Sequence, residues 1–227
     1  MRVLALAGQK GGSARTTTAT SLAVVAEMQG IRTVVFDLDP QASATLWRDS
    51  REAEYPDVAP AQPTRLPRLL EKAAEGGCGL AVLDCPPNAE GTTSAAVGAA
   101  DFVLIPMRPS ARDLAAVQST IRYVRDVAQK PYAVVLSACP TNTRAITDEI
   151  AGAMTEAGVP LCPIRMHQRV AHYSHVNSGL TATECDPKGR AAEELAELWR
   201  WVSKQANLHA GKPATRRARK PANKGAA

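Results

Sequence analysis

A lysine, two glycines and several hydroxyl side chains stand close together early in the sequence, in a pattern that could bind an anion. The stretch reads Lys10-Gly11-Gly12-Ser13-Ala14-Arg15-Thr16-Thr17. Backbone N–H groups in such a loop, and in the first turn of a following helix, attract negative charge, and the helix dipole adds to the attraction. Glycine lets the backbone approach a phosphate because it has no Cβ. The predicted phosphate-binding residues are Gly11, Gly12, Ser13, Ala14, Arg15, Thr16 and Thr17.

Apolar stretches on both sides of this loop indicate the elements that hold it. Residues 3–7 are predicted to form a strand, and residues 18–28 a helix. Further strands are expected at 33–37, 80–84, 102–106 and 132–138; further helices are expected at 40–52, 66–74, 112–128, 144–157 and 190–205. The alternation predicts an α/β fold, a mostly parallel twisted sheet with helices on both faces. Residues 54–67 contain four prolines and are expected to form a surface loop.

Three acidic residues stand where predicted strands end. Asp37 and Asp84 are the last residues of two strands, and Asp39 follows Asp37 by two positions. Ligands of parallel sheets bind at the carboxyl ends of the strands, where the glycine loop also lies. A carboxylate beside a phosphate loop can position Mg²⁺ or orient an attacking water. The sequence therefore predicts a metal site that includes Thr16, Asp37 and Asp84.

The loop and the acidic residues together resemble the signature boxes of the ParA/MinD ATPases. Lys10 to Thr17 resembles their deviant Walker A box, written Lys-Gly-Gly-x-Gly-Lys-Thr-Thr. Residues 37–41 match the Asp-x-Asp-Pro-Gln box, residues 80–87 resemble the Walker B strand with its prolines, and residues 106–110 resemble the Pro-x-x-Pro-Ser turn. The resemblance also implies a strand near 162–169, where the family has one rich in isoleucine and proline. The resemblance covers residues 1–206 and is strongest to the short, ParF-like partition proteins. It implies a P-loop NTPase fold of the deviant Walker A type.

The resemblance also implies a role for each of these residues. Lys10 would be the signature lysine that reaches the phosphates of a partner subunit in an ATP-dependent homodimer. Arg15 would contact the β- and γ-phosphates, Thr16 would bind Mg²⁺, and Asp39 would be the hydrolysis residue that orients the attacking water. The implied cofactors are ATP or ADP with Mg²⁺. The implied partners are a second copy of the chain, nonspecific DNA, and a ParB-like or centromere-binding protein.

Two residues depart from the family pattern and leave a second interpretation open. Arg15 stands where the family has its phosphate-binding lysine, and Ala14 stands where it has a glycine. A guanidinium is a planar fork and not a compact point charge, so the exchange is not conservative. The alternative is a nucleotide-gated dimerisation and DNA-binding module with negligible ATP hydrolysis. A reductase related to the nitrogenase iron protein would need paired cluster-binding cysteines, and the spacing of the five cysteines gives it no support.

Charge is distributed unevenly along the 227 residues. Residues 207–227 hold six basic residues and no acidic one, whereas the other 206 carry 21 basic and 22 acidic side chains. We predict a nucleotide-binding domain over residues 1–206 and a basic, disordered tail over 207–227 that suits DNA. The candidate DNA-binding residues are Arg165, Arg169, Lys188, Arg190, Arg216, Arg217, Arg219 and Lys220. The alternative is that the tail is a solvated segment without a binding partner.

Composition bounds the remaining possibilities. No apolar run is long enough to cross a membrane, and the sequence enters its first predicted strand without room for a signal peptide. The apolar stripe of helix 190–205 is expected to pack in the core and not to anchor to a membrane. The cysteines are expected to be reduced core residues, and the four histidines to lie on the surface. These features predict a cytoplasmic, nucleoid-associated protein.

Overall fold

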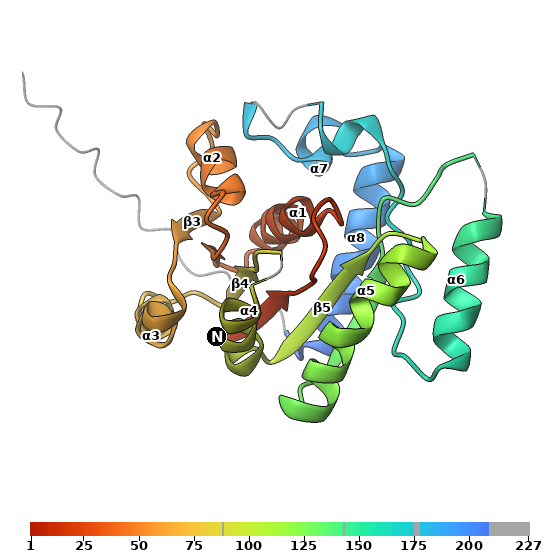
Figure 1. Ribbon diagram of the computed structural model, residues 1–227. Helices are drawn as coiled ribbons and strands as arrows, with labels where there is room; N and C mark the ends of the chain where they lie inside the picture. Colours follow the sequence, from red (N-terminus) through yellow and green to blue (C-terminus); the bar gives the residue numbers. More distant parts are fainter. Residues whose placement is uncertain (88, 143, 175–177, 209–227) are drawn as a thin grey trace, which may run out of the picture.

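A six-stranded, all-parallel sheet forms the centre of the molecule. The computed structural model describes residues 1–87, 89–142, 144–174 and 178–208 (Figure 1). The strand order is β3-β2-β4-β1-β5-β6, and every pair of neighbours is parallel. The strands are β1 (Arg2–Leu6), β2 (Thr33–Asp37), β3 (Asp57–Pro60), β4 (Leu80–Asp84), β5 (Phe102–Met107) and β6 (Tyr132–Leu136). The sequence-based prediction of a mostly parallel α/β fold is confirmed.

Helices cover both faces of the sheet because the inner strands are apolar on both sides. The helices are α1 (Arg15–Met28), α2 (Ser43–Asp49), α3 (Leu66–Glu75), α4 (Glu90–Ala99), α5 (Ala111–Arg122), α6 (Ala145–Glu156), α7 (Ala182–Cys185) and α8 (Arg190–Gln205). One apolar cluster joins the sheet to α3, α4, α5 and α6, and a second joins its other face to α1, α2, α7 and α8. In Figure 1, α2 and α7 lie above α1 at the top of the view. They border the site described below.

Two segments differ from the sequence-based prediction. The proline-rich stretch 54–67 is not only a loop, because it contains β3 and the short helical turn η1 (Pro63–Arg65). β3 is an edge strand that pairs on one side with β2, and an edge strand tolerates proline at its end since only one ladder of hydrogen bonds is required. The strand expected near 162–169 is reduced to two isolated bridges, Val134 with Leu161 and Cys139 with His167.

The helices of two other segments also differ from the sequence-based prediction. The helix expected over 112–128 consists of α5 and a π-helical turn, η2 (Tyr123–Val127). Helix α4 was not predicted, because its glycine, serine and threonine residues do not form a clear apolar stripe. A further short turn, η3 (Val170–His172), lies before α7.

Helix α8 packs against the sheet as its apolar stripe predicts. The buried residues of the stripe are Ala191, Leu195, Leu198, Trp199 and Val202. The indole nitrogen Nε1 of Trp199 donates a hydrogen bond of 3.0 Å to Oε1 of Gln29, just after α1.

All five cysteines are free thiols, and Cys85, Cys139 and Cys162 are buried. Among the described residues, no helix has the length and apolar character needed to span a bilayer.

Candidate functional site

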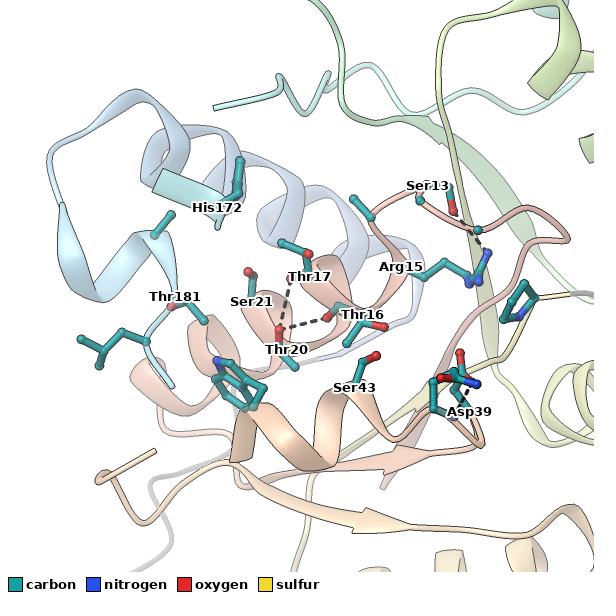
Figure 2. A pocket seen from close by; sticks show the side chains of 18 residues that line it. Ser13, Arg15, Thr16, Thr17, Thr20, Ser21, Asp39, Ser43, His172 and Thr181 are labelled. Atoms are coloured by element: carbon teal, nitrogen blue, oxygen red, sulfur yellow. Dashed lines mark hydrogen bonds between the residues drawn. The ribbon is translucent and has the colours of Figure 1, made fainter. Parts of the chain in front are cut away.

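The sheet brings the glycine loop and the acidic residues to one edge. In the register of the strands, Leu6 of β1 lies beside Asp84 of β4, and Asp84 lies beside Asp37 of β2. The loop between β1 and α1 therefore begins next to Asp84, and Asp37 lies one strand further away at the same end of the sheet. Figure 2 shows Ser13, Arg15 and Thr16 near this edge and Asp39 below them.

The glycine loop contains two residues in left-handed backbone conformations. Gly12 has φ of 76°, which glycine adopts without strain. Ala14, the residue before α1, has φ of 60° and ψ of 30°. Its methyl group costs about 1 kcal/mol relative to a glycine in this conformation. The family glycine at this position is thus explained physically, and its replacement is tolerated.

Arg15 directs its guanidinium into the loop and not into the open cavity. Its Nε donates to the carbonyl of Cys85 at 3.1 Å, and its Nη1 donates to the carbonyls of Gly8 at 3.0 Å and Lys10 at 2.6 Å. The same nitrogen also lies 3.3 Å from the hydroxyl of Ser13. Only 7% of Arg15 is exposed. Burial lowers the pKa of its guanidinium, and this effect outweighs the negative charge of Asp84, which raises it. The structure thus uses this charge to hold the loop together.

Asp84 is a buried carboxylate whose oxygens are unsatisfied. Within the described part of the chain neither oxygen has a hydrogen-bond partner of normal geometry, and the residue is 1% exposed. Burial raises the pKa of Asp84 to about 7, although the nearby Thr16 hydroxyl and Arg15 lower it. Buried polar atoms without partners are rare in proteins and call for a missing ligand. A Mg²⁺ ion with its water shell supplies the donors that such a carboxylate lacks, so Thr16 and Asp84 fit a hydrated Mg²⁺.

Asp37 already has protein donors on both carboxylate oxygens. Oδ2 accepts hydrogen bonds of 2.9 Å from the backbone N–H and the hydroxyl of Thr45, and Oδ1 accepts one of 3.1 Å from the N–H of Asp39. These bonds tie the first turn of α2 to the end of β2. Asp39 is partly exposed at the rim of the cavity, and its Oδ1 accepts a hydrogen bond of 2.9 Å from the N–H of Gln41. Asp37 therefore fixes the segment that carries Asp39.

Lys10 forms an ion pair within its own chain. Its Nζ lies 3.1 Å from Oδ1 of Asp113, in the first turn of α5, and the Lys10 side chain is 41% exposed. The hydroxyl of Ser110 also donates to Asp113. Burial raises the pKa of Asp113, but the hydrogen bonds from Ser110 and Lys10 outweigh it and leave the pKa lowered. Asp113 is thus an anion that holds the predicted signature lysine at the side of the loop.

Two cavities open beside the N-terminus of α1. The larger one, about 390 Å³, is lined by loop residues and by hydroxyl side chains. Figure 2 shows Thr16, Thr20 and Ser21 of α1 across from Ser43 of α2, with the Arg15 side chain pointing elsewhere. The smaller one, about 260 Å³, lies against Gly12 and Thr17 and is bounded by Arg108. Both cavities border the glycine loop.

Sequence reasoning missed two residues that line these cavities. His172, expected on the surface, is half-buried between the two cavities, and neither ring nitrogen has a partner among the described residues. Burial lowers the pKa of His172. Arg108 stands beside Gly12 in the turn after β5. The only sequence signal for Arg108 was its place in the Pro-x-x-Pro-Ser turn, at a strand end next to β1.

Three of the four predicted DNA-binding residues that the structure describes are paired with acids of the same chain. Arg165 lies 2.7 Å from Asp148, and Arg190 lies 3.3 Å from Glu193. Arg169 donates to Glu194, which also accepts hydrogen bonds from His167. Lys188 is exposed. The remaining four, Arg216, Arg217, Arg219 and Lys220, lie outside the described residues, as does the predicted tail after Leu208.

A comparison with known families decides the relationship. The model of the CobQ/CobB/MinD/ParA nucleotide-binding domain matches residues 4–182. The chain belongs to this family. The match runs from β1 through the start of α7, so it contains the glycine loop, Asp37, Asp39, Asp84 and Asp113. The resemblance to the ParA/MinD ATPases seen in the sequence is confirmed.

The chain is similar to several known proteins. It is 32% identical to the maintenance of carboxysome distribution protein A of Gloeobacter kilaueensis, over 88% of this chain and 96% of that protein. It is 29% identical to the chromosome-partitioning ATPase Soj of Thermus thermophilus, over 56% of this chain and 63% of that protein. The septum site-determining protein MinD of Pyrococcus horikoshii, solved with Mg-ADP, shares the fold with a TM-score of 0.69 at 16% identity. That match covers 91% of this chain and 98% of the other.

Proposed function

We propose that this chain is a ParA-type ATPase that forms a homodimer on binding ATP and Mg²⁺ and positions DNA or another cargo. The observation that carries the proposal is the unsatisfied Asp84 carboxylate beside Thr16, at the edge where the glycine loop begins. The likeness to a carboxysome distribution protein and to a chromosome-partitioning ATPase supports a positioning role. The nucleotide-binding domain spans residues 1–206, and the basic tail spans 207–227.

Each residue of the site has a part in this proposal. The backbone N–H groups from Gly11 to Thr17 bind the phosphates, because they stand at the N-terminus of α1. Thr16 and Asp84 hold the hydrated metal, which neutralises phosphate charge when it is bound. Asp39 orients the attacking water, and Asp37 keeps Asp39 in place through α2.

Binding to DNA without sequence preference falls to the basic tail in this proposal. The paired arginines Arg165 and Arg169 have their charges satisfied by acids of the same chain. The tail has six basic residues and no acidic partner in its own sequence. A ParB-like or centromere-binding protein is the proposed partner that stimulates hydrolysis and releases the DNA.

Deletion of residues 209–227 tests the DNA part of the proposal. Leu208 is kept because it packs against the apolar cluster under α8. With ATP and Mg²⁺ present, we expect the full chain to bind random duplex DNA with a slope of log K against log salt of roughly −5, if all six cations meet phosphates. The truncated chain should lose most of that slope, as measured by fluorescence anisotropy across a salt series. An unchanged affinity and slope would exclude the tail from DNA binding.

A second candidate function, nucleotide-gated binding with negligible hydrolysis, is favoured by the hydrogen bonds of Arg15. A guanidinium held by three carbonyls of the protein has only Nη2 left to donate to a phosphate. In this account nucleotide still brings two copies together, because Arg15 holds the loop whose amides bind the phosphates and leaves Lys10 to meet the second copy. The two candidate functions differ only in turnover, so turnover separates them.

The variant Arg15→Lys should raise the rate of ATP hydrolysis about tenfold or more. The compact ammonium cannot reproduce the hydrogen bond from Nε to Cys85, and its flexible stem lets it reach the phosphates. Tenfold corresponds to about 1.4 kcal/mol of transition-state stabilisation, which is modest for one charged contact. The matched control is Arg51→Lys, another buried arginine that donates to carbonyls. It should lose stability without a change in turnover. Equal or slower turnover of Arg15→Lys at full stability would contradict the second candidate.

A further inference from the structure

We propose that Arg108 is the cationic side chain that binds the nucleotide phosphates in this chain, in place of the residue at position 15. The inference rests on the nucleotide-binding function proposed above and names a residue for it. Three cations stand close to the glycine loop: Lys10, Arg15 and Arg108. Their hydrogen bonds and ion pairs decide which of them is free to meet an anion.

Two of the three cations are already engaged. Arg15 gives its Nε and Nη1 to carbonyls of Cys85, Gly8 and Lys10, and it is buried beneath the loop. Moving this guanidinium out toward a phosphate would leave three carbonyls without their donor, so only Nη2 is available where the side chain stands. Lys10 is paired with Asp113. Both charges therefore already have partners within the chain.

Arg108 is free and lies against the phosphate loop. A Cβ placed on Gly12 would come within 3.1 Å of Nη2 and 3.5 Å of Cζ of Arg108, so the guanidinium lies against the face of this glycine. Arg108 is exposed, and within the described chain no hydrogen bond or ion pair engages its guanidinium, although its charge helps to lower the pKa of Asp113. It also lines the smaller cavity together with Gly12, Ala14 and Thr17. The N–H donors of Arg108 therefore lie beside the backbone N–H groups of the glycine loop.

The turn that carries Arg108 is held in place on both sides. Met107, the last residue of β5, is hydrogen-bonded through its carbonyl to Ser137 after β6. On the other side, the N–H of Ser110 donates to the carbonyl of Arg108 at 2.8 Å, and Ser110 caps α5 through Asp113. A guanidinium presented from such a turn can form two parallel hydrogen bonds with a phosphate at little entropic cost.

Titration with ATP, ADP and AMP, each with Mg²⁺, tests this assignment on the full chain. In isothermal calorimetry, Arg108→Gln should weaken ATP and ADP binding about 10- to 100-fold, because a charge-assisted pair of hydrogen bonds is lost. AMP should change by less than about threefold, since it lacks the outer phosphates. Arg108→Lys should recover part of the ATP affinity, because a point charge replaces the fork. The control Arg112→Gln removes an exposed arginine four positions away and should leave ATP binding within about twofold.

The outcomes separate this inference from the function on which it rests. If the wild-type chain takes up ATP but Arg108→Gln binds it within about twofold of wild type, Arg108 is not the phosphate ligand. An equal loss for AMP and ATP would overturn the assignment to the outer phosphates, because it would place Arg108 against the α-phosphate, the ribose or the base. A wild-type chain that takes up no nucleotide would instead overturn the proposed function. Melting curves confirm that each variant is folded, since an exposed side chain contributes little to stability.

Discussion

Asp84→Asn should make the nucleotide-free protein more stable and abolish the effect of Mg²⁺ on ATP binding. The Asp84 carboxylate is 1% exposed and has no hydrogen-bond partner of normal geometry in the described chain. Burial of an ion without partners is costly, and a neutral amide of the same shape removes most of that cost. We expect a gain of about 2 kcal/mol, which raises the thermal midpoint by about 4–8 °C for a chain of this size. Differential scanning calorimetry without nucleotide measures it.

The same variant should lose affinity for the magnesium complex of ATP. If Asp84 holds a metal-bound water, its replacement should lower the gain in ATP affinity that Mg²⁺ provides by about 10- to 100-fold. Calorimetric titration with ATP, with Mg²⁺ or with a chelator, measures that gain. The control is Asp126→Asn, a half-exposed carboxylate paired with Arg125, which should change neither quantity. A lower thermal midpoint for Asp84→Asn, together with an unchanged magnesium effect, would remove Asp84 from the site.

The sequence predicts some elements of the fold well and others poorly. The strands Thr33–Asp37 and Leu80–Asp84 and the helix Arg190–Gln205 have the boundaries expected from the sequence. Their apolar patterns are local, so a short window contains the whole signal. The strand Asp57–Pro60 has no such signal, because an edge strand with prolines pairs on one side only and is half-exposed.

Some features of the site could be predicted from local sequence patterns, and others could not. That Asp37 and Asp84 end adjacent strands at the loop follows from the parallel-sheet pattern, and the register confirms it. The direction of the Arg15 side chain could not be predicted, because one acceptor is the carbonyl of Cys85, 70 residues away. The partner of Lys10 was hidden for the same reason, since Asp113 belongs to another helix. Side-chain partners across the fold depend on packing that no local pattern encodes.

Lys10→Ala should reduce ATP-dependent dimerisation about 30-fold or more, whereas Asp113→Asn should increase it about two- to fivefold. Loss of a buried charge pair across an interface costs about 2–5 kcal/mol. The resting pair of Lys10 with Asp113 is weaker, because Lys10 is 41% exposed and such pairs contribute at most about 1 kcal/mol. Lys10 therefore gains free energy when it exchanges Asp113 for a phosphate of a second copy. Analytical ultracentrifugation with ATP and Mg²⁺ gives both association constants.

The double variant Lys10→Ala with Asp113→Asn shows whether the two residues act through each other. If Asp113 opposes dimerisation only by holding Lys10, the double variant should match Lys10→Ala, and the gain from Asp113→Asn should vanish. The control Lys130→Ala removes a lysine after η2 and should leave the dimer unchanged. A gain from Asp113→Asn that survives without Lys10 would show that Asp113 acts through another neighbour, either the Ser110 hydroxyl or the charge of Arg108. A Lys10→Ala variant that dimerises normally would mean that the lysine serves its own subunit, where the structure already gives it a partner.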